Sequence, residues 1–560
     1  MTEVATDKGY AAACHRLAIA ALIIVLAWAG LLRFVGITHS RLLLCDESYY
    51  LMEAKRIVGQ VHACEAIAEI WRRDHPPGLI PLPASDRERI ESLANDGYGQ
   101  IGGRFGHDLL LAVGLLCGLP LEWGGQAIAA FFGLATVLFV AGWTGFMWGL
   151  RSGVLAAAVL GGSVVHLTYS RSVLCESDAL FFLTTSFIAY AVALKAQRVG
   201  VRTACVIAAG FSFGLAFVCN MRAIPVLYGF VVFEAMSLTP CISAKRLALF
   251  TVGAVLPPFL AEMLFHVVFL FSGATGVLLT RQTYIHSLLW QFSRLHGGVM
   301  APGTNVGQYI RYLVALENPV LLVLYLAGTV LVGYRAAGRG RESERLLLTV
   351  TLVVFGYWEA AVSLKCLRYI SEAAPFLAML AAQASAQIEH VAAVHWPKRA
   401  IVAWLALVLV CVASSSLTWR RWQEEPPGYQ EVAAWLVARS PCRIVATQPN
   451  YFRLYFSTAD VGIAETIEQL KDLHSRGFRW YVDCFQKYQS PARVSLLAIQ
   501  AFLLRVEPIR FPHPRANTPF NWYECGITDV PAEWAADASV IKVWDLDAVL
   551  GPAPHPPTGL

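Results

Sequence analysis

The sequence predicts an α-helical protein that crosses a membrane many times and carries a small α/β domain at its C-terminal end. Of the 560 residues, 56% are hydrophobic and only 15% are charged, whereas soluble domains average about 25% charged residues. The apolar residues gather in runs of roughly 20, the length at which a helix crosses a hydrocarbon core. After residue 421 the apolar runs shorten to strand length.

The apolar runs predict about eleven transmembrane helices, each with an uncertainty of several residues at its ends. The expected spans are residues 17–38, 126–149, 153–168, 178–194, 203–219, 223–239, 247–271, 318–334, 346–363, 370–388 and 400–418. The first run is too long for the apolar part of a signal peptide and no small-residue cleavage site follows it, so we expect it to remain as a helix.

Basic residues predict the orientation, because short loops rich in Lys and Arg stay in the cytoplasm. They cluster in four short connectors, formed by Lys195, Arg198 and Arg202; Lys245 and Arg246; Arg335, Arg339, Arg341 and Arg345; and Lys398 and Arg399. With a cytoplasmic N-terminus all four connectors fall inside, and the C-terminal domain falls outside. We therefore expect a bacterial inner (plasma) membrane protein whose C-terminal domain is periplasmic or extracellular. We expect no nucleic acid partner, since no basic patch is interleaved with aromatic residues.

Two domains are expected, a transmembrane domain over 1–420 with a large first outer loop at 39–125, and an outer α/β domain over 421–560. Within the loop, the stretch from His107 to Leu119 is too short to span and should lie along the membrane interface. In the tail, 442–447 and 478–484 read as buried strands. Helices are predicted at 429–439 and at 466–476, the second closed by Gly477.

The first candidate site is the segment LLLCDESYYLMEAKRI, directly after the first span. Asp46 and Glu47 stand at the start of a predicted helix, where acidic residues complement the helix dipole. Asp46, Tyr49, Tyr50 and Glu53 fall at i, i+3, i+4 and i+7, so they share one helix face. An ordinary acidic helix start at a membrane surface would give the same pattern.

A second acidic segment, TYSRSVLCESDAL, contributes Arg171, Glu176 and Asp178 in a short outer loop. Helix capping by Ser177 or Asp178 is the simpler explanation. However, two distant acidic segments fall on the same side at similar depth, where ionisable groups are costly and indicate function.

The third segment, SLKCLRYISEAAPFLAML, places Lys365 and Arg368 together at the outer end of a span. Cations on the outer side are unexpected, because basic residues near the ends of spans are enriched on the cytoplasmic side. They can reach into the headgroup region, or they can clamp a phosphate, for which arginine offers a two-pronged donor. Tyr369 adjoins this pair, and Arg222 is a weaker candidate of the same kind.

The remaining candidates lie on the acceptor or donor side of such a site. They are His75, Arg104, His107, Arg171 and Tyr50. Loop 272–317 mixes aromatic and basic residues, which fits an interfacial belt as well as sugar contacts. No metal motif is present and no cofactor is required, although a divalent cation could bridge Asp46, Glu176 and Asp178.

These parts fit sugar transfer from a lipid phosphate better than hydrolysis. A departing phosphate needs positive neighbours, and the acceptor hydroxyl needs one carboxylate base. A glycoside hydrolase needs two carboxylates in opposed roles. A lipid or glycan transporter, or a flippase without chemistry, is the alternative. It would carry charges near the midplane of its spans and repeated halves with broken helices. A ligase of whole glycans would use the same parts as the transferase.

The order of the motifs resembles the glycosyltransferase C superfamily, especially the branch of lipid A aminoarabinose transferases and protein O-mannosyltransferases. DESYY looks like its first-loop acidic motif, YSRSVLCESDAL like its second, and LRYISEAAPFLAML like its late R-Y-x-x-x-x-x-P segment. The tail segments EVAAWLVAR, IVATQPN and GFRWYVDC resemble its outer α/β domain.

The resemblance implies an inverting single displacement from a polyprenyl-phosphate sugar to a hydroxyl of a lipid, glycan or protein in the cell envelope. Asp46 would be the acceptor base with Glu47 as its neighbour, and Arg368 would lie near the phosphate. Glu176 or Asp178 would orient the acceptor or a metal.

The chain departs from the family pattern in two places. The family's segment of a basic residue or His followed by Pro-Pro is split here between HPPG at 75–78 and GRFGHDLLL at 103–111. Either His75, or Arg104 with His107, would take that role. Glu372 stands where the family often has an apolar residue or proline.

Overall fold

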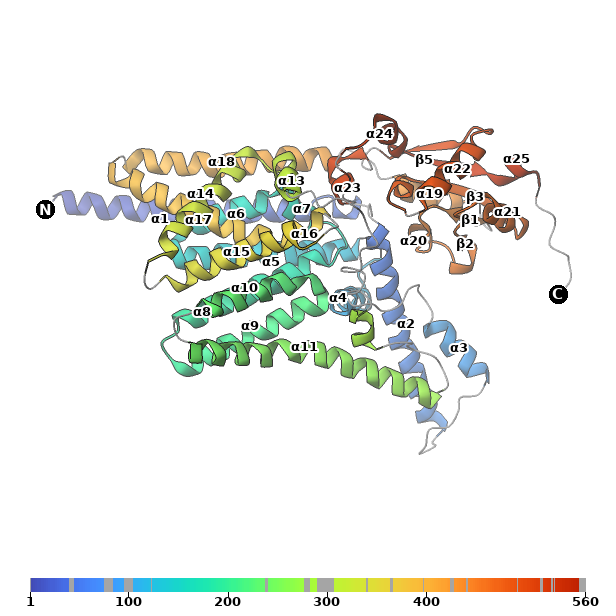
Figure 1. Ribbon diagram of the computed structural model, residues 1–560, viewed down its shortest axis with the longest axis horizontal. Helices are drawn as coiled ribbons and strands as arrows, with labels where there is room; N and C mark the ends of the chain where they lie inside the picture. The colour runs from blue at the N-terminus through green and yellow to red at the C-terminus, as the bar shows by residue number, and fades with distance from the viewer. Residues whose placement is uncertain are drawn as a thin grey trace.

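The computed structural model describes residues 2–39, 45–74, 84–94, 104–121, 123–236, 240–275, 283–289, 307–338, 341–362, 366–395, 397–423, 428–439, 442–490, 492–513, 517–524, 527 and 529–552. They form a long helical bundle joined end to end with a smaller α/β part (Figure 1). The N-terminus lies at the far end of the bundle and the C-terminus at the far end of the α/β part.

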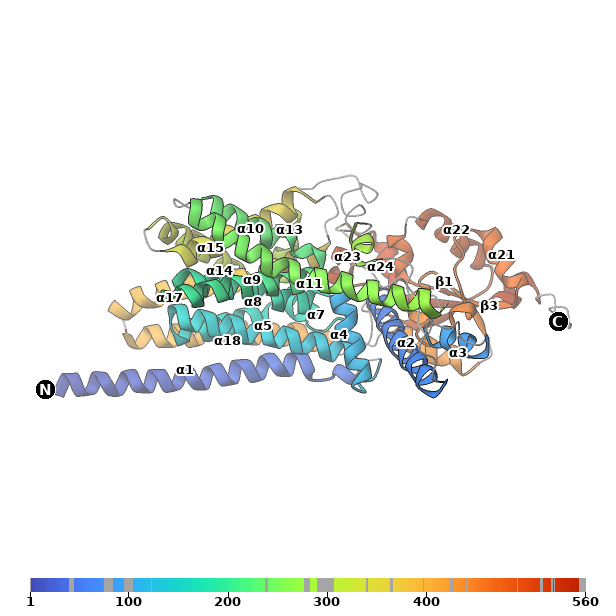
Figure 2. The same cartoon turned by 90° about the horizontal axis from the view of Figure 1, so that it is seen from below.

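The bundle consists of helices that run roughly along one axis, with short helical turns between them (Figures 1 and 2). Its elements are α1 (Thr2–Phe34), α5 (Gly124–Trp148), α6 (Leu150–Gly162), α7 (Val164–Tyr169), α8 (Glu176–Lys195), α9 (Val199–Cys219), η2 (Met221–Ala223), α10 (Ile224–Ala235), α11 (Pro240–Thr275), α13 (Gln308–Leu316), α14 (Pro319–Ala336), α15 (Glu342–Ala360), α16 (Leu367–Ile370), η3 (Ser371–Ala373), α17 (Ala374–His395) and α18 (Pro397–Gln423).

Six helices of the described chain are long and apolar enough to cross a membrane by length and composition. They are Ala12–Phe34, Gly124–Trp148, Glu176–Lys195, Val199–Cys219, Cys241–Leu270 and Pro319–Ala336. Large apolar side chains point outward from them, among them Ile24 at 66% exposure and Phe259 at 55%, as expected for surfaces that face lipid. The protein is therefore an integral membrane protein. The predicted total of about eleven spans stays a prediction.

Small residues let some bundle helices approach closely. In the α9–α11 pair, a side-chain carbon added at Gly210 would collide with the carbonyl oxygen of Phe250, and one added at Gly253 would collide with that of Ile207. Such contacts are typical of helices that associate within lipid. The lipid tails are as apolar as the side chains, so close packing replaces the hydrophobic effect as the driving force. Helix α6 lies in the middle of the bundle, and every residue from Ser152 to Gly162 is buried.

Three helices lie across the end of the bundle that adjoins the α/β part. They are α2 (Cys45–Asp74), α3 (Ala84–Ala94) and α4 (Phe105–Leu116). The helix predicted to start at Asp46 is confirmed as α2, with Asp46 and Glu47 in its first turn. Helix α4 covers most of the stretch expected at the interface, and it runs across the bundle axis (Figures 1 and 2).

The α/β part is built on a five-stranded mixed sheet with the order β2-β1-β3-β5-β4. Its elements are α19 (Gly428–Val437), β1 (Arg443–Ala446), α20 (Pro449–Phe452), β2 (Val461–Gly462), α21 (Ile467–Ser475), β3 (Phe478–Asp483), α22 (Arg493–Leu503), β4 (Ile509–Pro512), α23 (Pro519–Glu524), α24 (Ala532–Ala538), β5 (Val540–Asp545) and α25 (Leu546–Leu550). Strands β1, β2 and β3 are parallel, and β5 is antiparallel to both β3 and β4.

The four elements predicted in the tail are confirmed as β1, β3, α19 and α21. Helix α21 begins with a capping box, in which Thr466 and Gln469 satisfy each other's backbone N–H groups. It ends before Gly477, whose φ of 90° is a conformation that favours glycine. Strands β2, β4 and β5 and helices α22 to α25 were not predicted.

Candidate active site

The predicted acidic and basic segments converge where the bundle meets the α/β part (Figure 1). The starts of α2 and α8, the turn η2 and the short helix α16 come together there. Helix α23 lies at the junction in two perpendicular views (Figures 1 and 2) and packs against α13 and α16.

Asp46 and Arg368 form the central contact of this site. Nη1 of Arg368 donates a hydrogen bond of 2.7 Å to Oδ2 of Asp46, although 322 positions separate the two residues. The Asp46 side chain keeps 34% of its surface exposed and Arg368 keeps 12%, so an incoming molecule can reach the carboxylate. Burial would raise the pKa of Asp46, but the charges of Arg368, Arg104 and Arg222 outweigh it and hold that pKa well below the usual aspartate range.

A second carboxylate, from the α/β part, also binds Arg368. Glu524 at the end of α23 is buried and pairs with Nε of Arg368 through Oε1. Its Oε2 accepts hydrogen bonds from the backbone N–H of Arg368 at 3.2 Å and from the hydroxyl of Tyr169 at 2.7 Å. The sequence reasoning missed this residue, because a lone glutamate in a polar tail carries no pattern that separates it from surface residues.

Arg222 and Glu176 form a neighbouring ion pair. Nη1 of Arg222 donates to Oε1 of Glu176 at 2.9 Å, and both side chains are buried. The guanidinium of Arg222 also lies 4.3 Å from the ring centre of Tyr369, close enough for a cation–π contact. The charge of Arg222 acts on Asp46, so the two ion pairs belong to one electrostatic cluster.

A third group lies between α2, α4 and α8. His107 Nδ1 lies 3.2 Å from Oδ2 of Asp178, and both residues are buried. The ring of Tyr50 meets His107 edge to face at 5.1 Å, and the guanidinium of Arg104 lies 5.0 Å from the Tyr50 ring centre. Four residues predicted from three separate segments are thus in contact.

Two further predicted residues take part in contacts to the backbone. Oε1 of Glu47 accepts the backbone N–H of Val173 at 2.8 Å, which ties α2 to the loop before α8. Nη1 of Arg171 donates to the carbonyl oxygens of Leu32 and Arg33 at 2.7 and 3.1 Å, at the end of α1. The structure does not bring Arg171 into contact with the Asp46–Arg368 pair.

Lys365 and His75 lie outside the described residues, as does most of loop 272–317. Each of the three carboxylates considered for a divalent cation contacts its own basic side chain. Asp46 contacts Arg368, Glu176 contacts Arg222, and Asp178 contacts His107. In the described parts of the chain, no three His, Cys, Asp or Glu side chains gather closely enough to hold a metal ion.

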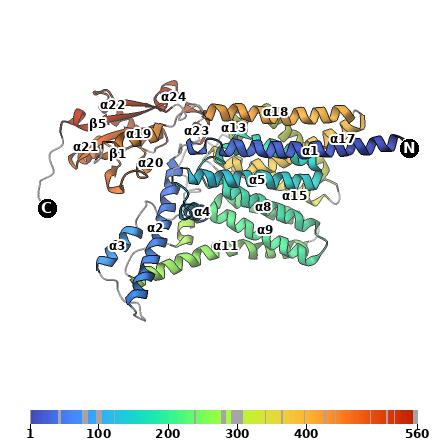
Figure 3. The same cartoon turned by 180° about the vertical axis from the view of Figure 1, so that it is seen from behind.

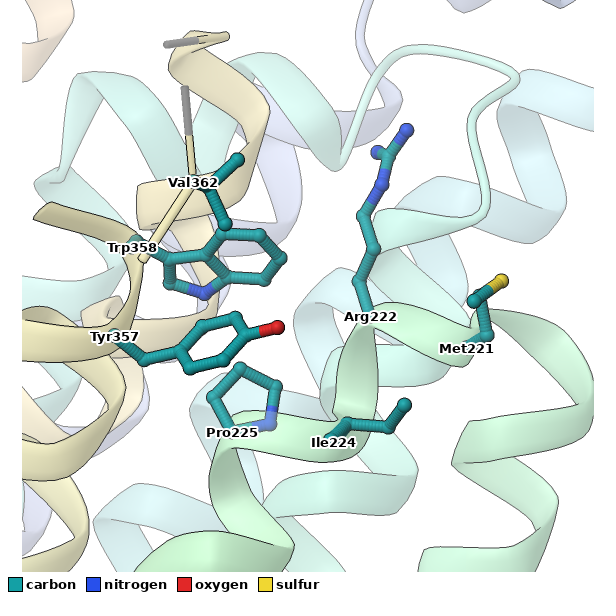
Figure 4. Close-up of a pocket in the computed structure, with 7 residues that line it drawn as sticks. All are labelled: Met221, Arg222, Ile224, Pro225, Tyr357, Trp358 and Val362. Atoms are coloured by element: carbon teal, nitrogen blue, oxygen red, sulfur yellow. The ribbon is translucent and has the colours of Figure 1, made fainter. Parts of the chain in front are cut away.

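A small, mostly apolar recess adjoins Arg222. Figure 4 shows the rings of Tyr357 and Trp358 along one side, with Arg222 on the facing side. The remaining lining residues are Met221, Ile224, Pro225 and Val362. Glu372, the residue that departs from the family pattern, accepts a hydrogen bond of 3.1 Å from Nε1 of Trp358. It therefore supports a wall of this recess.

Comparison with solved structures identifies the fold. The chain resembles an archaeal oligosaccharyltransferase, AglB from Archaeoglobus fulgidus, solved with an inhibitory peptide and a dolichol-phosphate. The TM-score is 0.55 at 12% identity, over 93% of this chain and 81% of that one. No protein-family model and no curated protein sequence matches the chain.

A second similar structure is ArnT from Cupriavidus metallidurans bound to undecaprenyl phosphate. The TM-score is 0.53 at 12% identity, and the match covers 95% of this chain and 99% of that one. The chain thus has the fold of the glycosyltransferase C enzymes, and the predicted resemblance is confirmed at the level of the fold.

Proposed function

We propose that this protein is an integral membrane glycosyltransferase. It moves a sugar from a polyprenyl-phosphate carrier to a hydroxyl group of a lipid, glycan or protein on the non-cytoplasmic side of the membrane. The observation that carries the proposal is the contact between Asp46 and Arg368. It places an accessible carboxylate beside a largely buried arginine. These are the two groups that transfer from a lipid phosphate needs, a base for the acceptor and a cation for the leaving group.

The donor phosphate binds to the guanidinium groups of Arg368 and Arg222 in this proposal, with Lys365 as a third cation. The small recess beside Arg222 marks where the polyprenyl chain would begin, because its lining is mostly apolar and adjoins a cation. The contact of Arg222 with Tyr369 holds the guanidinium in place.

The chemical step is a single displacement with inversion. The acceptor hydroxyl gives its proton to Asp46 as its oxygen attacks the anomeric carbon. The bond from that carbon to the phosphate oxygen breaks, and the phosphate leaves as an anion held by Arg368. Glu176 or Asp178 orients the acceptor. When the phosphate takes up hydrogen bonds of Arg368, Asp46 loses part of its ion pair and becomes a stronger base.

The proposed topology has about eleven spans, with a cytoplasmic N-terminus. The basic connectors between α8 and α9 and between α17 and α18 lie at the end of the bundle that carries the N-terminus, away from the candidate site (Figure 1). That arrangement supports the inside assignment of these connectors. The division into a transmembrane domain, 1–420, and an outer α/β domain, 421–560, belongs to the same proposal.

Reconstitution with radiolabelled polyprenyl-phosphate sugars tests the function. We expect label to move into a cell-envelope fraction with the wild type. We expect Asp46→Asn to reduce transfer by a factor of about 10² to 10⁴, the usual contribution of a positioned base. Glu65→Gln, an exposed carboxylate on the same helix, serves as the matched control and should transfer normally.

Two results would count against the proposal. Intact transfer by Asp46→Asn would remove the base assignment. Movement of labelled lipid across the bilayer without transfer to any acceptor would favour the transporter instead.

A further inference from the structure

The contacts of the Glu524 carboxylate resemble those that a protein makes with a bound anion. Its carboxylate forms an ion pair with the guanidinium of Arg368, and it accepts hydrogen bonds from the backbone N–H of the same residue at 3.2 Å and from the hydroxyl of Tyr169 at 2.7 Å. One cation and two hydrogen-bond donors, contributed by α7 and α16 of the bundle, converge on a carboxylate from the α/β part. A phosphate oxygen accepts the same donors, and arginine suits carboxylate and phosphate equally well.

Among the described residues, both arginines next to Glu524 and Asp46 already contact carboxylates. Arg368 already serves Asp46 and Glu524, while Arg222 is paired with Glu176. A phosphate that bound these donors of Arg368 would lie against the Glu524 carboxylate, and two anions side by side in a largely buried place repel each other. One of the two carboxylates on Arg368 must therefore give way when a phosphate binds.

Glu524 is the carboxylate that can move. It ends a six-residue helix, α23, whereas Asp46 belongs to the 30-residue helix α2. Besides Glu524, the described contacts of α23 to the bundle include the ring of Tyr523, which stacks on Tyr312 with centroids 4.5 Å apart. Burial raises the pKa of Glu524 although Arg368 opposes this, so the carboxylate is held there at a cost in solvation.

We propose that, in the protein without donor, the Glu524 carboxylate occupies the position where the donor phosphate binds. A lipid-linked phosphate then binds by displacing Glu524 together with α23. This inference builds on the proposed function. It makes Glu524 a residue that sets donor affinity, and it couples occupancy of the site to the docking of the α/β part.

The test measures the affinity for undecaprenyl phosphate in detergent for the wild type and for Glu524→Gln. Without the competing charge, we expect the Kd of the variant to be about tenfold lower. Glu468→Gln, an exposed glutamate of α21 in the same part of the chain, should bind as the wild type does. Undecaprenol, which lacks the phosphate, should bind all three proteins equally.

An unchanged or raised Kd in Glu524→Gln, with weaker binding in Arg368→Gln, would overturn the inference and leave the proposed function standing. Glu524 would then only position Arg368. If neither the wild type nor any variant bound the phosphate in preference to undecaprenol, the proposed function itself would fail.

A second measurement covers the case in which Glu524→Gln does not fold. In the wild type, undecaprenyl phosphate should speed amide hydrogen exchange across Pro519–Glu524, and undecaprenol should not. Exchange there that stays the same or slows with the phosphate would also overturn the inference.

Discussion

At the scale of single residues, the main feature of the site is that three carboxylates share two arginines. Asp46, Glu176 and Glu524 all gather around Arg368 and Arg222. Such sharing keeps Asp46 ionised, but it also weakens Asp46 as a base until another anion takes over Arg368. Arginine suits this role because it offers donors in several directions and stays charged when buried.

The first prediction concerns the acid limb of the pH–rate profile. The pKa of Asp46 lies well below the usual aspartate range, so the active, ionised form persists into acid and is lost only as the pH falls through that depressed pKa. Arg104→Gln removes one of the lowering charges. The pKa should rise, and the fall in kcat/KM should begin at a higher pH, by up to about one unit.

Arg505→Gln, an exposed arginine of the α/β part, is the control for the loss of one positive charge. An acid limb that stays in place in Arg104→Gln, while it is measurable in the wild type, would contradict the assignment of Asp46 as the titrating base.

At the scale of elements, α2 and α4 are joined through buried acids as well as apolar contacts. Glu53 on α2 and Asp108 on α4 are both buried and interact with each other. Burial raises the pKa of Asp108 to about 7, opposed by His107 and Arg104. A proton on Asp108 removes the repulsion between the two buried carboxyls.

The second prediction is that the docking of α4 weakens as the pH rises. The pKa of Asp108 is raised, so the folded protein binds more protons than the unfolded chain between about pH 4 and 7. The stability contributed by the proton is complete below about pH 4 and is lost progressively as the pH rises from about 4 to 7. Amide exchange in Phe105–Leu116 should therefore quicken, beyond the intrinsic effect of pH, between about pH 4 and 7 and level off above it.

Asp108→Asn cannot lose a proton, so exchange in this variant should show no such rise beyond the intrinsic effect of pH. An equal rise in the variant and the wild type would show that another group controls the docking of α4.

The third prediction concerns the α9–α11 contact. Gly210→Leu should force the two helices apart, because the neighbouring atoms are backbone and cannot turn away. Overpacking of this kind costs about 1–3 kcal/mol, and thermal unfolding in detergent should report it as a lower midpoint. Gly356→Leu in α15 makes the same change where nothing lies within 4 Å, and it should leave the midpoint close to that of the wild type. Equal midpoints for the two variants would contradict the close packing.

At the scale of the whole molecule, the bundle and the α/β part meet at the candidate site, and Figure 3 shows the same end-to-end arrangement from behind. The α/β part supplies Glu524 to the site and Tyr523 to a stack on Tyr312 of α13. The site is therefore assembled from both parts of the chain.

The fourth prediction tests this docking. Tyr523→Leu keeps apolar bulk but removes the ring stack, which is worth roughly 1 kcal/mol. Amide exchange in α23 should rise about fivefold, the factor that corresponds to that free energy. Tyr334→Leu, at a position that is 84% exposed in α14, should leave exchange in α23 unchanged. If both variants behaved as the wild type does, the stack would not hold α23.

Elements with strong local patterns were predictable from the sequence. Strands β1 and β3 are apolar runs, and α21 carries its cap and its closing glycine. Strand β4 was missed because its four residues include Pro512 and are mostly exposed, which leaves no apolar periodicity. Strand β5 has alternating apolar residues, and the pattern VIKVW could have revealed it.

Composition and spacing along the chain were enough to predict a membrane protein, the start of α2 and the acidic and basic segments that meet at one end of the bundle. Those features follow from composition and from spacing along a helix, which are local properties of the chain. The folded chain is needed to see that Arg368 binds Asp46 from 322 positions away and Glu524 from 156 positions away. Contacts over such separations depend on how helices pack and chain segments dock, and spacing in the sequence does not encode them.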